Sequence, residues 1–173
     1  MVYSRPPGAS ARDFAAAREW EEEVGTWLPT HRVAELDASD RLDYWVPGSF
    51  IEAKEKRQPL SARWHVLPGV PEVDLFVIDE LSVRRALRHF PSAYFVLRDL
   101  PGGRVFMARV DEMACAEHAR LQRGGKGKWV VNLRNFRLLA DPRAELMQAI
   151  FADQVSMPWK RSECLTMLEV PQA

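Results

Sequence analysis

The stretch Leu42-Asp-Tyr-Trp-Val-Pro-Gly-Ser-Phe-Ile-Glu-Ala-Lys54 predicts a β-hairpin that carries charged side chains. Its first half, with Tyr44, Trp45 and Val46, favours a strand, and the Pro-Gly-Ser segment that follows is typical of a turn. The second half alternates apolar and polar residues up to Lys54, as a half-buried strand does.

The register of this hairpin determines which charged side chains meet. A loop symmetric about Pro47 and Gly48 would place Asp43 opposite Glu52, with their Cβ atoms roughly 4.5–5.5 Å apart, and Lys54 on the same face. A three-residue loop would instead put Asp43 and Glu52 on opposite faces. Two facing carboxylates destabilise a hairpin unless something offsets them, and a divalent cation beside Lys54 would do so.

The composition predicts a single domain and leaves the partner open. The chain has 173 residues, 47% of them hydrophobic, and 24 basic against 24 acidic side chains. The charges are unevenly distributed: residues 13–43 hold nine acids and three bases, whereas residues 120–137 hold six bases and no acid. This asymmetry suits a metal site beside a groove for a polyanion, although two uneven patches of ordinary surface charge would look the same.

The cysteines and the hydropathy indicate a cytoplasmic protein. Cys115 and Cys164 lack metal-ligand spacing, so two reduced thiols are expected. The N-terminus has no apolar signal core, and no run approaches the roughly 18 apolar residues of a membrane span.

The remaining elements follow from periodicity and from turn residues. The pattern predicts a helix from Ser10 or Asp13 to about residue 28, a strand over 31–36, a turn over 37–40 and an irregular loop over 60–72. It then predicts a strand over 73–78, a helix from residue 79 or 82 to about 90, strands over 93–98 and 104–109, a helix over 110–121, a flexible basic loop over 122–128, a strand over 129–133 and a helix over 142–153.

Two basic segments could meet phosphates. Arg84, Arg85 and Arg88 share the outer side of the helix that ends near residue 90, which is either a phosphate-binding face or a solvated one. The glycine-rich loop over 122–128 lacks the spacing of a phosphate-binding P-loop, but its lysines could follow a nucleic-acid strand.

The order of the predicted elements, with Asp43 and then Glu52-Ala-Lys54 in the hairpin, resembles the PD-(D/E)XK nuclease superfamily, and within it the restriction-endonuclease-like and Holliday-junction-resolvase-like proteins. The resemblance covers roughly residues 13–110 of one domain, and residues 111–173 would be an extension. It implies an α/β fold in which helices flank a central mixed β-sheet in the order α-β-β-β-α-β. The chain departs from the family pattern in having Leu42, and not proline, before the aspartate.

The resemblance also implies roles for individual residues. Asp43 and Glu52, with Ala53 between the motif residues, would bind one or two Mg²⁺ ions, for which Mn²⁺ could substitute, and Lys54 would orient or activate the attacking water. Many members add a glutamate from the first helix, and here Glu21 is the first choice and Glu23 the second. The residues expected to contact nucleic acid are Lys56, Arg57, Gln58, Arg84, Arg88, Lys126, Lys128 and Arg134.

Three hypotheses follow for the function. The first is a magnesium-dependent endonuclease that acts on nucleic acid, DNA rather than RNA, and needs no membrane; because many relatives of this kind act as dimers, a homodimer fits it. The second is an inactive nuclease-like fold that serves as a nucleic-acid-binding or assembly module. The third is an unrelated α/β protein in which Glu52 and Lys54 are the solvated face of a strand. Carboxylates favour magnesium over zinc here, because histidine and cysteine are scarce.

Overall fold

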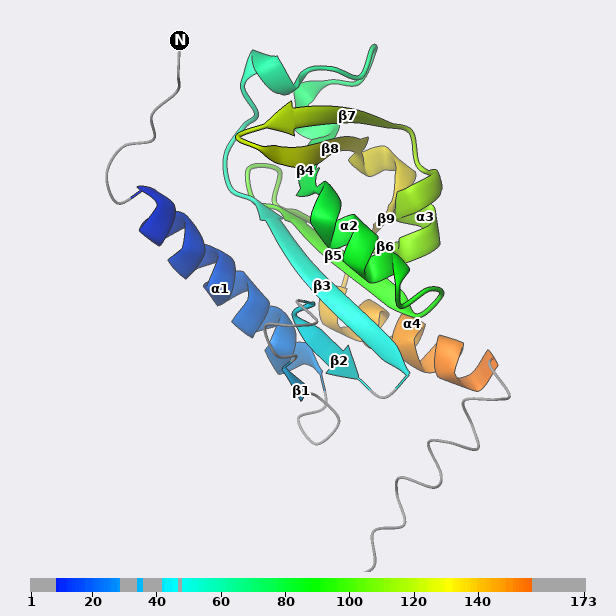
Figure 1. Cartoon of the computed structure of the whole chain (residues 1–173). Coiled ribbons are helices and arrows are strands. Elements are labelled where there is room, and N and C mark those ends of the chain that lie inside the picture. Colours follow the sequence, from blue (N-terminus) through cyan, green and yellow to red (C-terminus); the bar gives the residue numbers. More distant parts are fainter. Residues whose placement is uncertain (1–8, 29–33, 36–41, 47, 157–173) are drawn as a thin grey trace, which may run out of the picture.

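The computed structural model describes residues 9–28, 34–35, 42–46 and 48–156 (Figure 1). Its larger sheet has six strands in the order β1-β2-β3-β5-β6-β9. These strands are β1 (Ala34–Glu35), β2 (Tyr44–Val46), β3 (Ser49–Lys56), β5 (Ala93–Asp99), β6 (Arg104–Arg109) and β9 (Arg137–Leu138). The sheet is mixed, because β3 and β5 run parallel whereas the other neighbouring strands run antiparallel.

The β2–β3 hairpin has the register that a symmetric loop predicts. Val46 pairs with Ser49 and Tyr44 pairs with Ile51, so continuing the ladder by one position brings Asp43 opposite Glu52. Gly48, in the turn, has a φ of 86°, which glycine adopts without a steric penalty. The predicted register is confirmed, and the three-residue loop is wrong.

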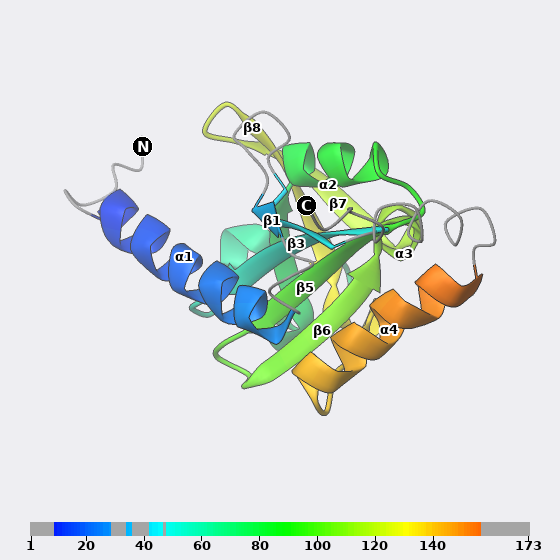
Figure 2. The ribbon, with the colours of Figure 1, turned by 90° about the horizontal axis from the view of Figure 1, so that it is seen from below.

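Helices cover both faces of the large sheet (Figure 2). Helices α1 (Ala9–Trp27) and α4 (Pro142–Ser156) lie on one face. Helices α2 (Glu80–Leu87) and α3 (Val110–Cys115) lie on the other, together with a second sheet of three strands in the order β4-β8-β7. Those strands are β4 (Leu75–Asp79), β8 (Lys126–Asn132) and β7 (His118–Arg123).

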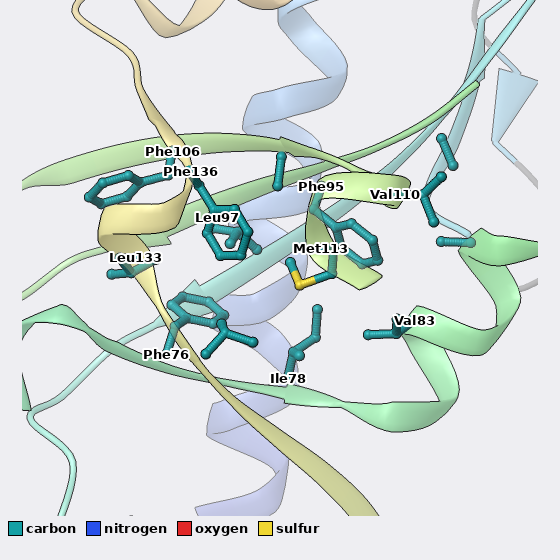
Figure 3. Close-up of a cluster of buried hydrophobic side chains, with 14 of the residues drawn as sticks. Phe76, Ile78, Val83, Phe95, Leu97, Phe106, Val110, Met113, Leu133 and Phe136 are labelled. Carbon is teal, nitrogen blue, oxygen red and sulfur yellow. The ribbon is translucent and has the colours of Figure 1, made fainter. Parts of the chain in front are cut away.

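Each face of the large sheet has its own hydrophobic core. Trp20 and Val24 of α1 and Ile150 of α4 pack with Ile51 and Val96 of the sheet. The core on the opposite face joins the sheet to α2, α3 and the second sheet; its labelled members in Figure 3 are Phe76, Ile78, Val83, Phe95, Leu97, Phe106, Val110, Met113, Leu133 and Phe136. Burying such a side chain fully contributes about 1.5–3 kcal/mol, so these two cores fix the helices on the sheet.

The prediction of a helix over residues 110–121 is wrong beyond its first half. Helix α3 ends at Cys115, Ala116 is extended, with a φ of −62° and a ψ of 146°, and β7 begins at His118. The predicted flexible loop over 122–128 is also wrong, because Gly124 and Gly125, with φ values of 57° and 75°, form the turn of a β7–β8 hairpin. Two consecutive residues with positive φ match the turn that joins tightly paired strands.

The other predicted elements are present within a few residues of their expected ends. Helix α1 begins at Ala9, ahead of both predicted caps, and the irregular loop over 60–72 includes the short 3₁₀ helix η2 (Ala62–Trp64) and the start of η3 (Glu72–Asp74). The predicted fold class is confirmed, because helices flank a central mixed sheet. The elements α1, β1, β2, β3, α2 and β5 keep the order α-β-β-β-α-β, with β4 of the second sheet inserted between β3 and α2.

Some predictions concern parts of the chain outside the described residues. They are most of the strand over 31–36, the turn over 37–40, Pro47 and Cys164. Among the described residues, no helix combines the length and the hydropathy that crossing a bilayer requires.

Candidate active site

Asp43 lies at the point where the pairing of β2 with β3 ends. Strand β2 begins at Tyr44, so the next ladder position on β3 has no described strand residue opposite it. The backbone N–H of Ala53 instead donates to Oδ2 of Asp43, at 2.5 Å. A side-chain carboxylate therefore takes the place of a backbone carbonyl and is held against the edge of β3.

Glu52 and Lys54 project from the same face of β3. Their register partners on the parallel strand β5 are Phe95 and Leu97, which both belong to the core beneath α2. The carboxylate and the ammonium group thus emerge on the side of the large sheet that carries α2 and the second sheet.

The two carboxylates and the amine converge in the folded chain. Nζ of Lys54 lies 2.7 Å from Oε1 of Glu52 and 3.9 Å from Oδ2 of Asp43. The same nitrogen donates to the backbone carbonyl of Ala53, at 3.1 Å. Three of the predicted site residues and the carbonyl between them therefore form one cluster.

Burial makes the charge of the Glu52 carboxylate energetically unfavourable. Glu52 is only 2% exposed, and its Oε2 is buried without a hydrogen-bond partner among the described residues. A buried carboxylate oxygen without a donor is unfavourable by about 1–3 kcal/mol or more. The arrangement thus leaves one hard oxygen acceptor ready for a cation.

The titration of Asp43 reflects the same crowding. The pKa of Asp43 is raised from 3.8 to about 7, and burial is the main cause. Lys54 and the Ala53 N–H oppose the rise, whereas the carboxylates of Glu52 and Glu21 contribute to it. Burial alone would lower the pKa of Lys54, but Glu52 and Asp43 outweigh it, so this pKa lies above its ordinary value of 10.5. Lys54 therefore keeps its positive charge at neutral pH.

A pocket of about 620 Å³ opens beside the cluster, between α1 and the C-terminal half of β3. Glu21, Lys54, Arg57 and Gln58 are among its lining residues. Glu23 is engaged elsewhere, because its carboxylate oxygen lies 2.6 Å from Nη1 of Arg98. Of the two helix glutamates, Glu21 is therefore the one on the wall of this pocket.

The possible metal donors of the cluster are oxygen atoms, which would suit a magnesium ion better than a zinc ion. Within the described part of the chain, no group of three or more histidine, cysteine, aspartate or glutamate side chains is placed to hold a metal. Magnesium is commonly bound through one or two carboxylates, with waters and substrate phosphates completing its shell. At this cluster the two carboxylates would be those of Asp43 and Glu52, with the Ala53 carbonyl as a further oxygen donor.

The residues predicted to contact nucleic acid do not form one surface. Arg57 and Gln58 line the pocket beside Lys54, as does Lys56 in part. However, the ammonium of Lys56 is buried, donates to the backbone carbonyls of Glu72 and Leu75, both at 3.2 Å, and lies 3.1 Å from Oε1 of Glu72. Its contacts are those of a lysine that ties β3 to the segment before β4.

The remaining basic residues do not line this pocket. Arg84 and Lys126 line a second pocket, Lys128 pairs with Asp79, and Nε of Arg134 lies 2.6 Å from Oδ2 of Asp74. Arg88 is exposed just after α2, where it is the C-terminal cap residue.

No local pattern of residues predicts the arginine that links α1 to the sheet in addition to the hydrophobic core. Arg98 of β5 pairs with Glu55 of β3 and with Glu23 of α1, and its guanidinium lies 4.1 Å from the ring centroid of Trp20. Glu55 and Arg98 are direct register partners in the parallel β3–β5 pair. This pairing holds the helix that carries Glu21 beside the cluster.

No protein-family model matches the sequence, and a search of curated proteins gave no match. Among solved structures, the chain is similar to D212, a nuclease from a fusselovirus. The TM-score is 0.45 and the sequence identity 11%, and the superposition covers 82% of this chain and 94% of the other. This likeness is too distant to assign a role to any residue.

Proposed function

We propose that the protein is a magnesium-dependent nuclease that hydrolyses phosphodiester bonds in nucleic acid, DNA in preference to RNA. The observation that carries the proposal is the convergence of Asp43, Glu52 and Lys54, together with the buried, unpartnered Oε2 of Glu52. An ordinary solvated strand face would not bury a carboxylate in this way.

Asp43, Glu52 and the Ala53 carbonyl would hold the metal ion, and Mn²⁺ would be an acceptable substitute. When bound, Mg²⁺ would supply a Lewis acid that polarises the phosphate and lowers the pKa of water. The carboxylates themselves provide hard oxygen ligands, which that ion prefers.

Lys54 supplies a fixed positive charge to the reaction. Because its pKa is raised, it remains an ammonium ion while it lies beside the phosphodiester. A charge fixed in a buried site stabilises the negative charge that develops on the attacking oxygen and the phosphoryl oxygens. Glu21 on the pocket wall would assist as a third acid, and Arg57 and Gln58 on the same wall would contact the phosphates that flank the cleaved bond.

The test is the cleavage of supercoiled plasmid DNA with Mg²⁺, with Mn²⁺ and with EDTA. We expect cleavage with either metal and none with EDTA, and a loss of roughly 10²–10³-fold in rate for Glu52→Gln and for Lys54→Met. Glu117→Gln is the matched control, because Glu117 is exposed and outside the cluster. Undiminished cleavage by Lys54→Met, or by folded Glu52→Gln, would refute the mechanism.

One observation favours a non-catalytic alternative, in which the fold only binds nucleic acid. The ammonium of Lys54 already neutralises Glu52 at 2.7 Å, so the cluster is partly balanced without a metal. A wild-type protein that binds DNA in Mg²⁺ but leaves both plasmid and branched substrates intact would support this alternative over hydrolysis.

A further inference from the structure

A second pocket, of about 480 Å³, lies between the start of α2 and the β7–β8 hairpin. Its lining includes four basic side chains, namely Arg84, Arg85, Arg120 and Lys126. Figure 1 shows the two elements on the same side of β3, with the hairpin turn extending beyond the end of α2 that follows β4. The pocket therefore joins two segments that are distant in sequence and that both carry positive charge.

A buried glutamate fixes two of these arginines. Glu80 is 7% exposed; its Oε1 lies 2.6 Å from Nη2 of Arg84, and its Oε2 lies 2.7 Å from Nε of Arg120. The carboxylate packs against Gly127, where a Cβ atom would clash with it. An arginine already held in place loses less conformational freedom when it binds an anion.

Positive charge remains after these pairs are counted. The two acids that line the pocket, Asp79 and Glu80, are both paired, Asp79 with Lys128 outside the lining. Arg120 uses only Nε in its contact, and it has no other hydrogen-bond or ion-pair partner among the described residues, so its terminal nitrogens can serve a ligand. A guanidinium with free terminal N–H groups favours a phosphate, which accepts two parallel hydrogen bonds.

The second pocket adjoins the first along β4. Val77 lines the pocket beside Lys54, and Asp79, two residues later, lines the pocket beside Glu80. Residues two apart in a strand project from the same face, about 7 Å from one another. A nucleic-acid strand that lies against Lys54 can therefore reach the second pocket.

We propose that the second pocket binds a backbone phosphate of the nucleic acid through Arg84 and Arg120, as an anchor separate from the residues that would cleave. The inference rests on the proposed function for the identity of the polyanion. Glu80 is the positioning residue: it holds both guanidinium groups but does not touch the phosphate.

Binding measured in EDTA tests the anchor without any cleavage. Fluorescein-labelled DNA is titrated with the protein at several salt concentrations, and the change in anisotropy is followed. We expect Arg84→Gln and Arg120→Gln each to weaken binding roughly tenfold. Each should also reduce the slope of log K against log salt by about 1. Both variants should fold, because each leaves Glu80 with one of its two arginines.

Arg143→Gln is the matched control, since Arg143 is exposed on α4 and lines neither pocket. It removes the same charge and should change affinity less than twofold. Equal weakening by all three substitutions would show that only diffuse charge matters and would overturn the proposal. Unchanged affinity in Arg84→Gln and Arg120→Gln would overturn it too.

Inorganic phosphate provides a second arm that does not depend on DNA. In the ¹⁵N-labelled protein, phosphate should shift the amide signals of Gly125 and Gly127, and Arg120→Gln should abolish these shifts. Shifts confined to residues outside the pocket would contradict the proposal. A wild type that cleaves plasmid while both arginine variants bind DNA normally would refute the anchor alone, whereas phosphate shifts in a protein that never cleaves would refute only the proposed hydrolysis.

Discussion

Replacing Asp43 by asparagine should make the metal-free protein more stable than the wild type at about pH 8, but not at about pH 4. The cause is the buried position of this carboxylate beside Glu52, which raises the pKa of Asp43 from 3.8 to about 7. Asparagine cannot ionise, yet it keeps a side-chain oxygen that can accept the hydrogen bond from the Ala53 N–H. Lys54 keeps Glu52 as its partner, at 2.7 Å, so no ammonium is left unpaired.

The sign of the effect follows from where the proton is released. Below 3.8 the Asp43 carboxyl is protonated in both the folded and the unfolded chain. Between 3.8 and about 7 the unfolded chain releases this proton first, so the free energy of unfolding falls as the pH rises. Above about pH 7 the carboxyl is ionised in both states, and the free energy of unfolding falls no further.

The magnitude follows from the difference between the two pKa values. The two pKa values differ by about three, and a pKa difference of one corresponds to ~1.4 kcal/mol. The free energy of unfolding should therefore fall by ~4 kcal/mol between about pH 4 and pH 8. The side chain of Asp43 remains 17% exposed. Solvent screening should therefore reduce the difference between the variant and the wild type to about 2–3 kcal/mol.

Urea unfolding in EDTA across this pH range measures the difference directly. Other carboxylates, such as Asp111 and Glu145, have lowered pKa values and change stability in the opposite direction, but they contribute equally to both proteins. Glu117→Gln serves as the control for removing an exposed carboxylate. If the curves for the wild type and Asp43→Asn run parallel from pH 4 to pH 8, the reasoning about burial at this site is refuted.

Two substitutions test how α1 is held. Arg98→Met should lower the free energy of unfolding by about 2 kcal/mol, because it removes the strand partner of Glu55, whose side chain is 4% exposed and which keeps, among the described residues, only Nε of Arg57, at 3.1 Å. Urea unfolding should show a smaller effect in a Glu55→Met background, and an equal effect would contradict the pairing. Gly25→Ala should be destabilising by about 1 kcal/mol, because crowding outweighs the ~1 kcal/mol that alanine contributes to a helix. The added Cβ would lie 2.8 Å from Oη of Tyr44, so the same substitution in a Tyr44→Ala background should stabilise, and a stabilising effect in the wild type would refute the crowding.

Local patterns predicted the part of the site that lies within one hairpin. The spacing of Asp43, Glu52 and Lys54 follows from alternation and from a turn two residues long, and both are properties of adjacent residues. The fold class was predictable for a similar reason, because each element has its own periodicity. The metal and the substrate stay predictions.

The partners of Lys56 and Arg98 could not be predicted, since they depend on which strands become neighbours. Strand β5 pairs in parallel with β3 although 36 residues, 57–92, separate the end of β3 at Lys56 from the start of β5 at Ala93. That pairing places Glu55 against the half-buried Arg98, and the buried Lys56 against the buried Asp99. A lysine that looked available for phosphate from its neighbours in sequence is therefore occupied by contacts made across the fold.

The error over residues 110–121 has a different origin, because the decisive signal was present. The helical prediction extends to residue 121 and the loop prediction begins at residue 122, yet Gly124 and Gly125 mark a tight turn between two strands. In the hairpin, His118 stacks on Trp129 with ring centroids 3.8 Å apart, a cross-strand contact that a helix would not provide. The same pairing places Arg120 beside Glu80. The second pocket could not be predicted from the sequence, because this segment was expected to be helical.

The candidate active site lies at an incomplete strand edge, and this position explains why structure and chemistry are coupled there. Strand β2 pairs with only the first three residues of β3. The N–H and C=O of Ala53 therefore have no described strand residue to pair with on that side. The N–H is satisfied by the carboxylate of Asp43, and the C=O accepts from the ammonium of Lys54. Unpaired edges invite association with other strands. In the proposed mechanism, the same two side chains that block the edge would also provide the charge for hydrolysis. Alanine at position 43 would then remove both functions at once, whereas asparagine would separate them.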